Sequence, residues 1–301
     1  MPLYLDVPFS DKDEAKALGA RWDPDSKQWY APNKDEYPKF QKWILDSDED
    51  EFVVDNIGSA DMDVVEGESG SKPGNKPISL FNSFDSIVVF DVETTGTNPN
   101  HDEIIDIALV RVVNKQGEPV IEDEYGALIK LTEGRKLPPF ITDLTGITEQ
   151  QLLEEGISKD MACDNILKML RNDNTLLVAY NAHFDLSFLY HFLNRHEKAS
   201  VLRKVKMFDL LTVYKDRHPY PHKLGDAAEM YSIDMSGAHR ALNDAKATFN
   251  LLCKVSKELD DLEYYINLFG YNPKYGVSGS KISSVKYLPQ SYYRDKKLYE
   301  S

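Results

Sequence analysis

Two acidic residues, Asp91 and Glu93, follow an apolar run at residues 87–90 in a pattern that suits a metal ion. The run is rich in β-branched and aromatic residues, which is typical of a buried strand, and Thr95-Gly96-Thr97 supplies turn residues that end it. Because side chains alternate along a strand, the two carboxylates project from one face of the sheet. Mg²⁺ and Mn²⁺ prefer oxygen ligands. Since Asp-x-Glu is common, more acids must decide between a metal site and a solvated strand end.

Two later segments of the chain carry further acids. Residues 181–185 lie where a short apolar strand passes into a helix, and strand ends are where α/β sheets bind ligands. Asp185 falls in the first turn of that helix, a position that the helix dipole alone also favours for an acid. His239 and Asp244 are five positions apart. They can approach one centre only if His239 lies in the loop before the helix.

Three motifs together closely resemble those of the histidine-containing branch of the Asp-Glu-Asp-Asp exonuclease superfamily. They are Phe90-Asp91-Val92-Glu93-Thr94-Thr95-Gly96, Asn181-Ala182-His183-Phe184-Asp185 and His239-Arg240-Ala241-Leu242-Asn243-Asp244-Ala245. Leu144-Thr145-Gly146-Ile147 and Lys223-Leu224-Gly225-Asp226-Ala227-Ala228 also look like segments of the proofreading epsilon subunit of bacterial DNA polymerase III. The resemblance covers roughly residues 84–259 and implies a ribonuclease H-like fold, two divalent metal ions, Mg²⁺ or Mn²⁺, and 3′→5′ hydrolysis of nucleic acid.

The resemblance also implies a role for each residue. Asp91, Glu93 and Asp244 would hold one metal ion. Asp91 would bridge to the second ion, and Asp185 would support that ion directly or through water. Two ions about 3.5–4 Å apart stabilise both the attacking and the leaving oxygen of a displacement at phosphorus. His239 would take a proton from the attacking water, which suits an imidazole with a reference pKa of about 6.5.

The leading functional hypothesis is a metal-dependent 3′→5′ exonuclease of the proofreading or repair type. It would release nucleoside monophosphates from DNA 3′ ends, single-stranded ends above all. The residues expected to bind the terminal nucleotide are Thr94, Thr95, Leu144, Asn181 and Phe184. A 3′→5′ exoribonuclease is an open alternative, because the motifs also serve RNA-trimming enzymes and discrimination of the 2′-OH cannot be read from them. A binding module with an idle nuclease domain is a third, although none of the acids is missing.

The strands and helices around these motifs predict an α/β domain over residues 84–260. Strands are expected at 103–113 and 120–131, joined by a hairpin turn at 114–117, and these precede parallel strands with crossover helices. Helices are expected at residues 138–144, 148–154, 158–171, 184–194, 210–216, 223–231 and 240–259. The predicted fold class is therefore a ribonuclease H-like mixed sheet flanked by helices. The chain contains no polymerase-like segment, so we expect proofreading to act on ends made by a separate polymerase.

Residues 1–46 are predicted to form a small α+β module, in which Ser10 caps a helix that Gly19 ends. All three tryptophans lie there, and we expect their rings to form the core of a domain too small to build one otherwise. The alternative is that bases stack on exposed rings among Lys16, Arg21, Lys27 and Lys42. The module resembles a short domain of unknown function found on bacterial and phage DNA-processing proteins. The resemblance rests on Leu5-Asp6-Val7-Pro8-Phe9, Ala15-Lys16, Gly19-Ala20-Arg21-Trp22-Asp23 and Trp29-Tyr30.

Residues 47–83 are predicted to be an acidic disordered linker that accounts for most of the net charge of −15. The acids concerned are Asp48, Glu49, Asp50, Glu51, Asp55, Asp61, Asp63, Glu66 and Glu68, together with Asp46 directly before the linker. The linker ends in Pro77-Ile78-Ser79-Leu80-Phe81, which resembles the pentapeptide that polymerase partners insert into the sliding clamp, with proline in place of the first glutamine. We favour the alternative that Ile78, Leu80 and Phe81 attach the linker to the next domain.

Residues 261–301 form a predicted extension rich in tyrosine and lysine. Bases can stack on its tyrosines while its cations follow phosphates, or the aromatic residues can fold the segment back over the helices. No run of residues approaches the ~20 apolar residues of a membrane span, and the first eleven are too polar for a signal peptide. Cys163 and Cys253 are expected to be buried thiols. We therefore expect a cytoplasmic protein without a disulfide or a membrane contact.

Overall fold

The computed structural model describes residues 3–5, 7, 11–23, 28–32, 39–40, 43, 80–171, 174–291 and 296–301. The chain divides into two compact units, Met1–Val53 and Val54–Ser301. Several sequence-based predictions concern residues outside the described ranges: the linker up to residue 79 with its acids, the cap Ser10, the cations Lys27, Lys42 and Arg294, the apolar Ile78, and the tyrosines Tyr292 and Tyr293.

In its described residues, the first unit contains a small antiparallel sheet and a helix. Its elements are β1 (Leu3–Leu5), α1 (Lys12–Ala17), β2 (Arg21–Asp23) and β3 (Gln28–Ala31), and the strand order is β1-β3-β2. Trp43 is 2% exposed, and its indole nitrogen donates to Asp11 at 3.0 Å. Trp22 is 50% exposed and meets Trp29 edge to face. The aromatic residues therefore divide between the core of the unit, which Trp43 joins, and its surface.

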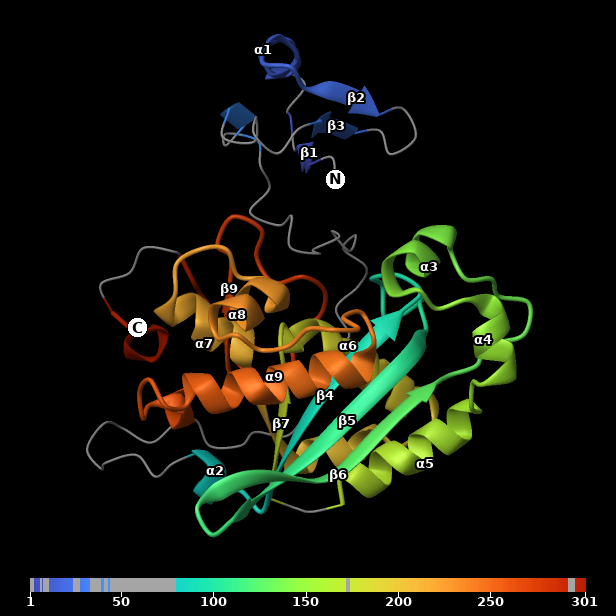
Figure 1. The fold of residues 1–301 in the computed structure, drawn as a ribbon, viewed down its shortest axis with the longest axis vertical. Coiled ribbons are helices and arrows are strands. Elements are labelled where there is room, and N and C mark those ends of the chain that lie inside the picture. Colours follow the sequence, from blue (N-terminus) through green and yellow to red (C-terminus); the bar gives the residue numbers. More distant parts are fainter. Residues whose placement is uncertain are drawn as a thin grey trace. The chain divides into compact units, whose positions relative to one another are not determined.

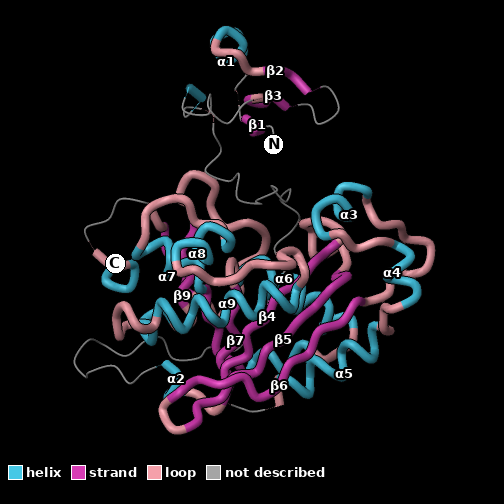
Figure 2. Tube along the Cα trace, viewed as in Figure 1, coloured by secondary structure: helices cyan, strands magenta, loops and turns pink. Residues whose placement is uncertain are grey.

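The second unit is built on a five-stranded mixed sheet with the strand order β6-β5-β4-β7-β8. Figures 1 and 2 show its neighbouring strands β6, β5, β4 and β7. Its strands are β4 (Ser86–Thr94), β5 (Ile104–Lys115), β6 (Glu118–Leu128), β7 (Thr175–Ala179) and β8 (Val205–Asp209). β5 pairs antiparallel with β4 and β6, whereas β7 runs parallel to β4 and β8. β4 is thus the central strand, which confirms the predicted mixed sheet.

Helices cover both faces of this sheet. The helices are α2 (Leu80–Ser83), α3 (Pro139–Thr145), α4 (Glu149–Glu154), α5 (Lys159–Met169), α6 (Ala182–Arg195), α7 (Leu210–Arg217), α8 (Leu224–Met230) and α9 (Ala241–Val255). One hydrophobic core joins the sheet to α5 and α6, and a second joins it to α7, α8 and α9. Figure 1 shows α9 lying across its face of the sheet. Since α9 ends at Val255, the predicted helix at 240–259 was too long at its C-terminal end.

Several elements were not expected from the sequence. β8 is only five residues long, and its lysine and aspartate interrupt the apolar run. β9 (Leu268–Tyr271) and β10 (Lys286–Pro289) form a separate parallel pair, and three short 3₁₀ helices are present in the described residues. The latter are η3 (Ala199–Lys204), η4 (Leu262–Tyr265) and η5 (Leu298–Glu300).

The segment after residue 260 packs as part of the second unit. Tyr265, Phe269 and Leu298 are at most 1% exposed and lie in the two cores of the sheet. Leu80 and Phe81 are buried in the α9-side core, as expected if they attach the linker to this domain.

Two other expectations concern membranes and thiols. No helix among the described residues is long and apolar enough to cross a membrane. Both cysteines are free thiols, Cys163 buried and Cys253 half-buried, which confirms the absence of a disulfide between them.

Candidate active site

The first pair of acids lies at the C-terminal end of β4. Ile87 and Val89 pack in the core beneath α9, while Val88, Phe90 and Val92 pack on the opposite face. Asp91 and Glu93 continue the series that faces α9, since side chains alternate along a strand. Both are half-buried. The prediction that they share one face of the sheet is therefore confirmed.

The loop after β4 is held by its own hydroxyl groups. Thr94 Oγ1 donates to the carbonyl of Gly96 at 2.5 Å. The Thr95 hydroxyl donates to Asp102 Oδ1 at 3.2 Å and accepts the main-chain N–H of Glu103 at 3.0 Å. A Cβ on Gly96 would lie 2.5 Å from Asp102 Oδ2, so a larger residue here would displace the Asp102 carboxylate. The two threonines thus shape the rim of the site, and their contact with a nucleotide stays a prediction.

The third acid comes from the first turn of α6. Asn181 precedes the helix with a φ of 69°, and the amides of Asn181 and Ala182 both donate to Asp209 Oδ1 at 3.1 Å. One turn further on, Asp185 is 4% exposed, and its Oδ1 accepts the main-chain N–H of Val92 at 3.2 Å. The start of α6 is therefore attached directly to the end of β4.

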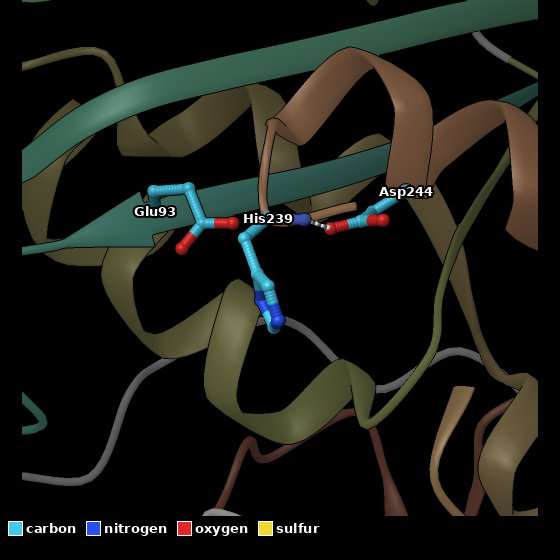
Figure 3. A group of neighbouring side chains, drawn as sticks. All are labelled: Glu93, His239 and Asp244. Atoms are coloured by element: carbon cyan, nitrogen blue, oxygen red, sulfur yellow. Dashed lines mark hydrogen bonds between the residues drawn. The ribbon is translucent and has the colours of Figure 1, made fainter. Parts of the chain in front are cut away.

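The fourth acid and the histidine come from the start of α9. His239 lies in the preceding loop with a φ of 64°, as the spacing of the motif requires. Its main-chain N–H donates to Asp244 Oδ2 at 2.9 Å (Figure 3). Glu93, His239 and Asp244 each offer one ligand atom, and these atoms lie within 4.8 Å of one another. The imidazole makes no hydrogen bond with another residue of the described part of the chain.

The electrostatics of the site disfavour so many carboxylates without cations. Burial raises the pKa of Asp91 well above its usual range, and the neighbouring carboxylates of Asp185, Glu93 and Asp244 raise it further. Burial also raises the pKa of Asp185 strongly, although the hydrogen bond from Val92 opposes the shift. The pKa of Asp244 is raised by burial as well. Bound divalent cations would remove this repulsion.

The donor set fits divalent metal ions. Asp244 Oδ1 is buried and has no hydrogen-bond partner among the described residues, which leaves a carboxylate oxygen available as a ligand. The surrounding donors are carboxylate oxygens and one imidazole, and an oxygen-rich set suits Mg²⁺ or Mn²⁺. The five residues proposed from the sequence thus gather around the end of β4.

The two apolar residues expected to contact a base lie in different settings. Leu144 is on α3 and 47% exposed, whereas Phe184 is half-buried on α6, with its ring 5.0 Å from that of Phe188. Their contact with a nucleotide stays a prediction. Two buried acids that support the site, Asp106 and Asp209, were not predicted from the sequence. Each sits in or next to an apolar strand segment, and a buried acid there is the signal that could have revealed it.

Fold and site together define the ribonuclease H-like class of α/β domains, with acids from β4, α6 and α9 at one end of the central strand. Residues 88–252, more than half of the chain, match the family model described as Exonuclease. The chain therefore belongs to the exonuclease family. Residues 3–44 match a second model, described as Domain of unknown function (DUF5710), in agreement with the resemblance noted for the first unit.

Curated relatives include polymerase and exonuclease chains. The DNA polymerase III PolC-type of Caldanaerobacter subterraneus subsp. tengcongensis is 31% identical over 63% of this chain and 13% of its own length. The 3′-5′ exonuclease DinG of Staphylococcus epidermidis is 32% identical over 59% of this chain and 19% of its own. The DNA polymerase III PolC-type of Bacillus subtilis is 35% identical over 58% of this chain and 12% of its own length. This chain thus spans less than a fifth of the length of these relatives.

Solved structures of similar fold include exonuclease I. The complex of E. coli exonuclease I with a dA16 oligonucleotide superimposes with a TM-score of 0.54 at 21% identity, covering 60% of this chain and 42% of that one. The zinc-bound form of its complex with single-stranded DNA gives a TM-score of 0.53 at 21% identity, with the same coverage. At this level of identity the similarity establishes the fold alone.

Proposed function

We propose that this protein is a metal-dependent 3′→5′ exonuclease that removes nucleoside monophosphates from DNA 3′ ends. The observation that carries the proposal is the meeting of Asp91, Asp185 and Asp244 with Glu93 and His239 at the end of β4. Membership of the exonuclease family supports it. The identity to a DinG 3′-5′ exonuclease and to PolC-type polymerases supports DNA as the substrate.

We assign the binding of the metal ions to the four carboxylates. Asp91, Glu93 and Asp244 would hold one ion, and Asp91 and Asp185 would hold the other. When bound, the two ions neutralise charge on the phosphodiester and on the leaving oxygen and help to activate water. The all-oxygen character of the four acids favours Mg²⁺ or Mn²⁺.

The remaining chemistry is assigned to His239. A ring nitrogen accepts a proton from the attacking water, and the exposed position of the residue leaves that nitrogen open to the substrate. The Asp244 carboxylate orients the histidine through its main-chain N–H. Thr94, Thr95, Asn181, Leu144 and Phe184 hold the terminal nucleotide.

We further propose single-stranded 3′ ends as the preferred substrate. Structures of similar fold were solved with single-stranded DNA bound, and the half-exposed Leu144 offers an apolar surface to an unpaired base. A contact with a sliding clamp through residues 77–81 has less support, because Leu80 and Phe81 are buried in the domain core.

The test is hydrolysis of 5′-labelled single-stranded DNA and RNA of the same sequence with Mg²⁺, Mn²⁺ or EDTA. We expect a DNA ladder that shortens from the 3′ end, requires the metal and is absent with Asp91→Ala. A 3′-phosphate-blocked strand and a duplex of equal length are the matched substrate controls. A ladder on RNA alone would replace the proposal by exoribonuclease activity. Binding without hydrolysis of either strand would indicate an idle nuclease domain.

A further inference from the structure

A carboxylate outside the proposed mechanism holds the loop that carries His239. Asp106 lies in β5, directly opposite Glu93 in the pairing of β4 with β5. Its side chain is 5% exposed. Oδ2 accepts a hydrogen bond from Arg240 Nε at 3.0 Å, and the two side chains form an ion pair. The main-chain N–H of Ala241 also faces this carboxylate and lowers its pKa. One buried acid on the sheet therefore holds two successive residues of α9's start.

These contacts replace an ordinary helix cap. Arg240 is the N-cap residue of α9 and has extended backbone geometry, but its own side chain does not cap the helix. The first amides of a helix need acceptors, which an N-cap side chain usually supplies. Here the Asp106 carboxylate, from a different element, holds the side chain of the N-cap residue and faces the first amide of the helix. The start of α9 is thus fixed relative to β5 rather than only relative to itself.

His239 directly precedes the two anchored residues. Its φ of 64° lies in the left-handed region, which residues other than glycine rarely adopt, so the surrounding contacts must maintain it. On the other side of the loop, Asn243 Nδ2 donates to the carbonyl of Gly237 at 2.7 Å. Since the imidazole makes no hydrogen bond with a described residue, its position follows from the main chain.

We propose that Asp106 and Arg240 form a positioning pair that holds His239 in place for proton transfer. The inference rests on the proposed function, because it assigns two further residues to the same reaction. Arg240 connects the loop to the sheet through its hydrogen bond to Asp106. Because the Asp106 carboxylate is buried, this charged hydrogen bond is strong. An uncharged residue in place of Asp106 would add no negative charge near Asp91 and Asp244, whereas the Asp106 carboxylate does add one. The presence of a charged Asp106 at this position is therefore explained by its ion pair with Arg240.

The first test is a mutant cycle with Arg240→Ala, Asp106→Asn and His239→Ala. We expect each of the first two to lower kcat/KM by about tenfold to hundredfold, the loss typical of a displaced catalytic group. In a His239→Ala background the same changes should cause no further loss, because the pair acts through the histidine. Lys246→Ala is the matched control, since Lys246 pairs with Glu124 at 2.6 Å and also ties α9 to the sheet. It should keep wild-type activity.

The second test is amide hydrogen exchange of a peptide covering residues 237–244, which needs no activity. Arg240→Ala should exchange faster there than the wild type, and Lys246→Ala should not. Because Arg240 is half-exposed, its replacement is informative even if Asp106→Asn does not fold. Unchanged exchange and kcat/KM in Arg240→Ala would overturn the inference, and so would equal losses with and without His239. An inactive wild type would refute the proposed function, and the exchange result would then decide whether the pair holds the loop.

Discussion

At the scale of single residues, the site is a set of acids that repel one another until cations bind. Asp185 is 4% exposed and Asp244 8%, and each has a raised pKa because burial disfavours its charged form. Such repulsion lowers the stability of the metal-free fold. Bound cations would restore the charge balance, so we expect the site to bind them. Stability and metal binding should therefore be linked in measurable ways.

The pH dependence of stability follows from the sign of the shift at Asp185. A folded-state pKa raised above the unfolded value, about 3.9, means that the folded state binds more protons, so stability rises as the pH falls through the folded pKa. In EDTA near pH ~8, Asp185→Asn should melt above the wild type, by about 2–4 °C for each 1 kcal/mol of repulsion removed. The difference should shrink as the pH falls towards about 4. A difference that grows on acidification would contradict this.

Bound divalent metal should reverse the order of the melting temperatures of the wild type and Asp185→Asn. Ions that bind only the folded wild type stabilise it by about 2.7 kcal/mol at one hundred times the dissociation constant. Adding Mg²⁺ near pH ~8 should therefore raise the melting temperature of the wild type more than that of Asp185→Asn. Differential scanning calorimetry with and without EDTA measures both. Equal shifts for the two proteins would remove Asp185 from the metal site.

His239 can act as a base or as a ligand, and one substitution separates the roles. We expect His239→Ala to lower kcat by about 10²–10⁴-fold, the usual contribution of a general base, while Mn²⁺ affinity by calorimetry changes little. The close grouping of Glu93, His239 and Asp244 makes the second measurement necessary. A parallel loss of Mn²⁺ affinity would show that the imidazole binds the ion.

At the scale of elements, one buried acid joins two helices to the sheet. Asp209 ends β8 and is 6% exposed. Its carboxylate accepts the amides of Asn181 and Ala182 at the start of α6 and those of Leu211 and Thr212 at the start of α7. Because Asp185 lies in the first turn of α6, this acid also positions a residue that we propose as a metal ligand.

Removing that carboxylate should destabilise the fold. Asp209→Ala leaves several buried amides without acceptors, and we expect a loss of about 3 kcal/mol or more in the free energy of unfolding. Urea denaturation followed by circular dichroism measures it. Asp234→Ala is the control, because Asp234 also accepts a main-chain N–H, that of Ser236 at 2.8 Å, but is exposed. Similar midpoints for the two variants would contradict the role of Asp209.

The sequence predicted the elements whose signals are local. The apolar run before Asp91, the capping box of Thr148 and Gln151, and the apolar face of α9 each lie within a few residues of what they determine. β8 was missed because it is short and its burial depends on pairing with β7. The supporting roles of Asp106 and Asp209 were not visible for a similar reason, since their partners are far away along the chain.

At the scale of the whole molecule, the C-terminal segment completes the exonuclease unit. Ile282 and Val285 pack in the core on the α6 face, and Leu298 packs in the core on the α9 face. Tyr287 OH lies 2.7 Å from His183 Nδ1, beside the start of α6. The sequence left open whether this segment binds nucleic acid or folds back, and these contacts support folding back.

A truncated chain distinguishes the two roles of this segment. Ending the chain at Asn272 removes three buried aliphatic side chains, and we expect the melting temperature to fall by about 10 °C or more. Lys274→Ala with Lys281→Ala is the companion variant, because it removes cations and leaves the packing. A truncated protein that melts like the wild type but binds single-stranded DNA more weakly would favour the binding role instead.

The most direct measurement of the central claim is mononucleotide release from single-stranded DNA with Mg²⁺ by the wild type and by Asp244→Asn. The substitution keeps an oxygen that can accept the N–H of His239 and removes the charge of a carboxylate whose Oδ1 is otherwise unpartnered. We expect release by the wild type, none by Asp244→Asn, and folding of both. Release at the wild-type rate by a folded Asp244→Asn protein would contradict it.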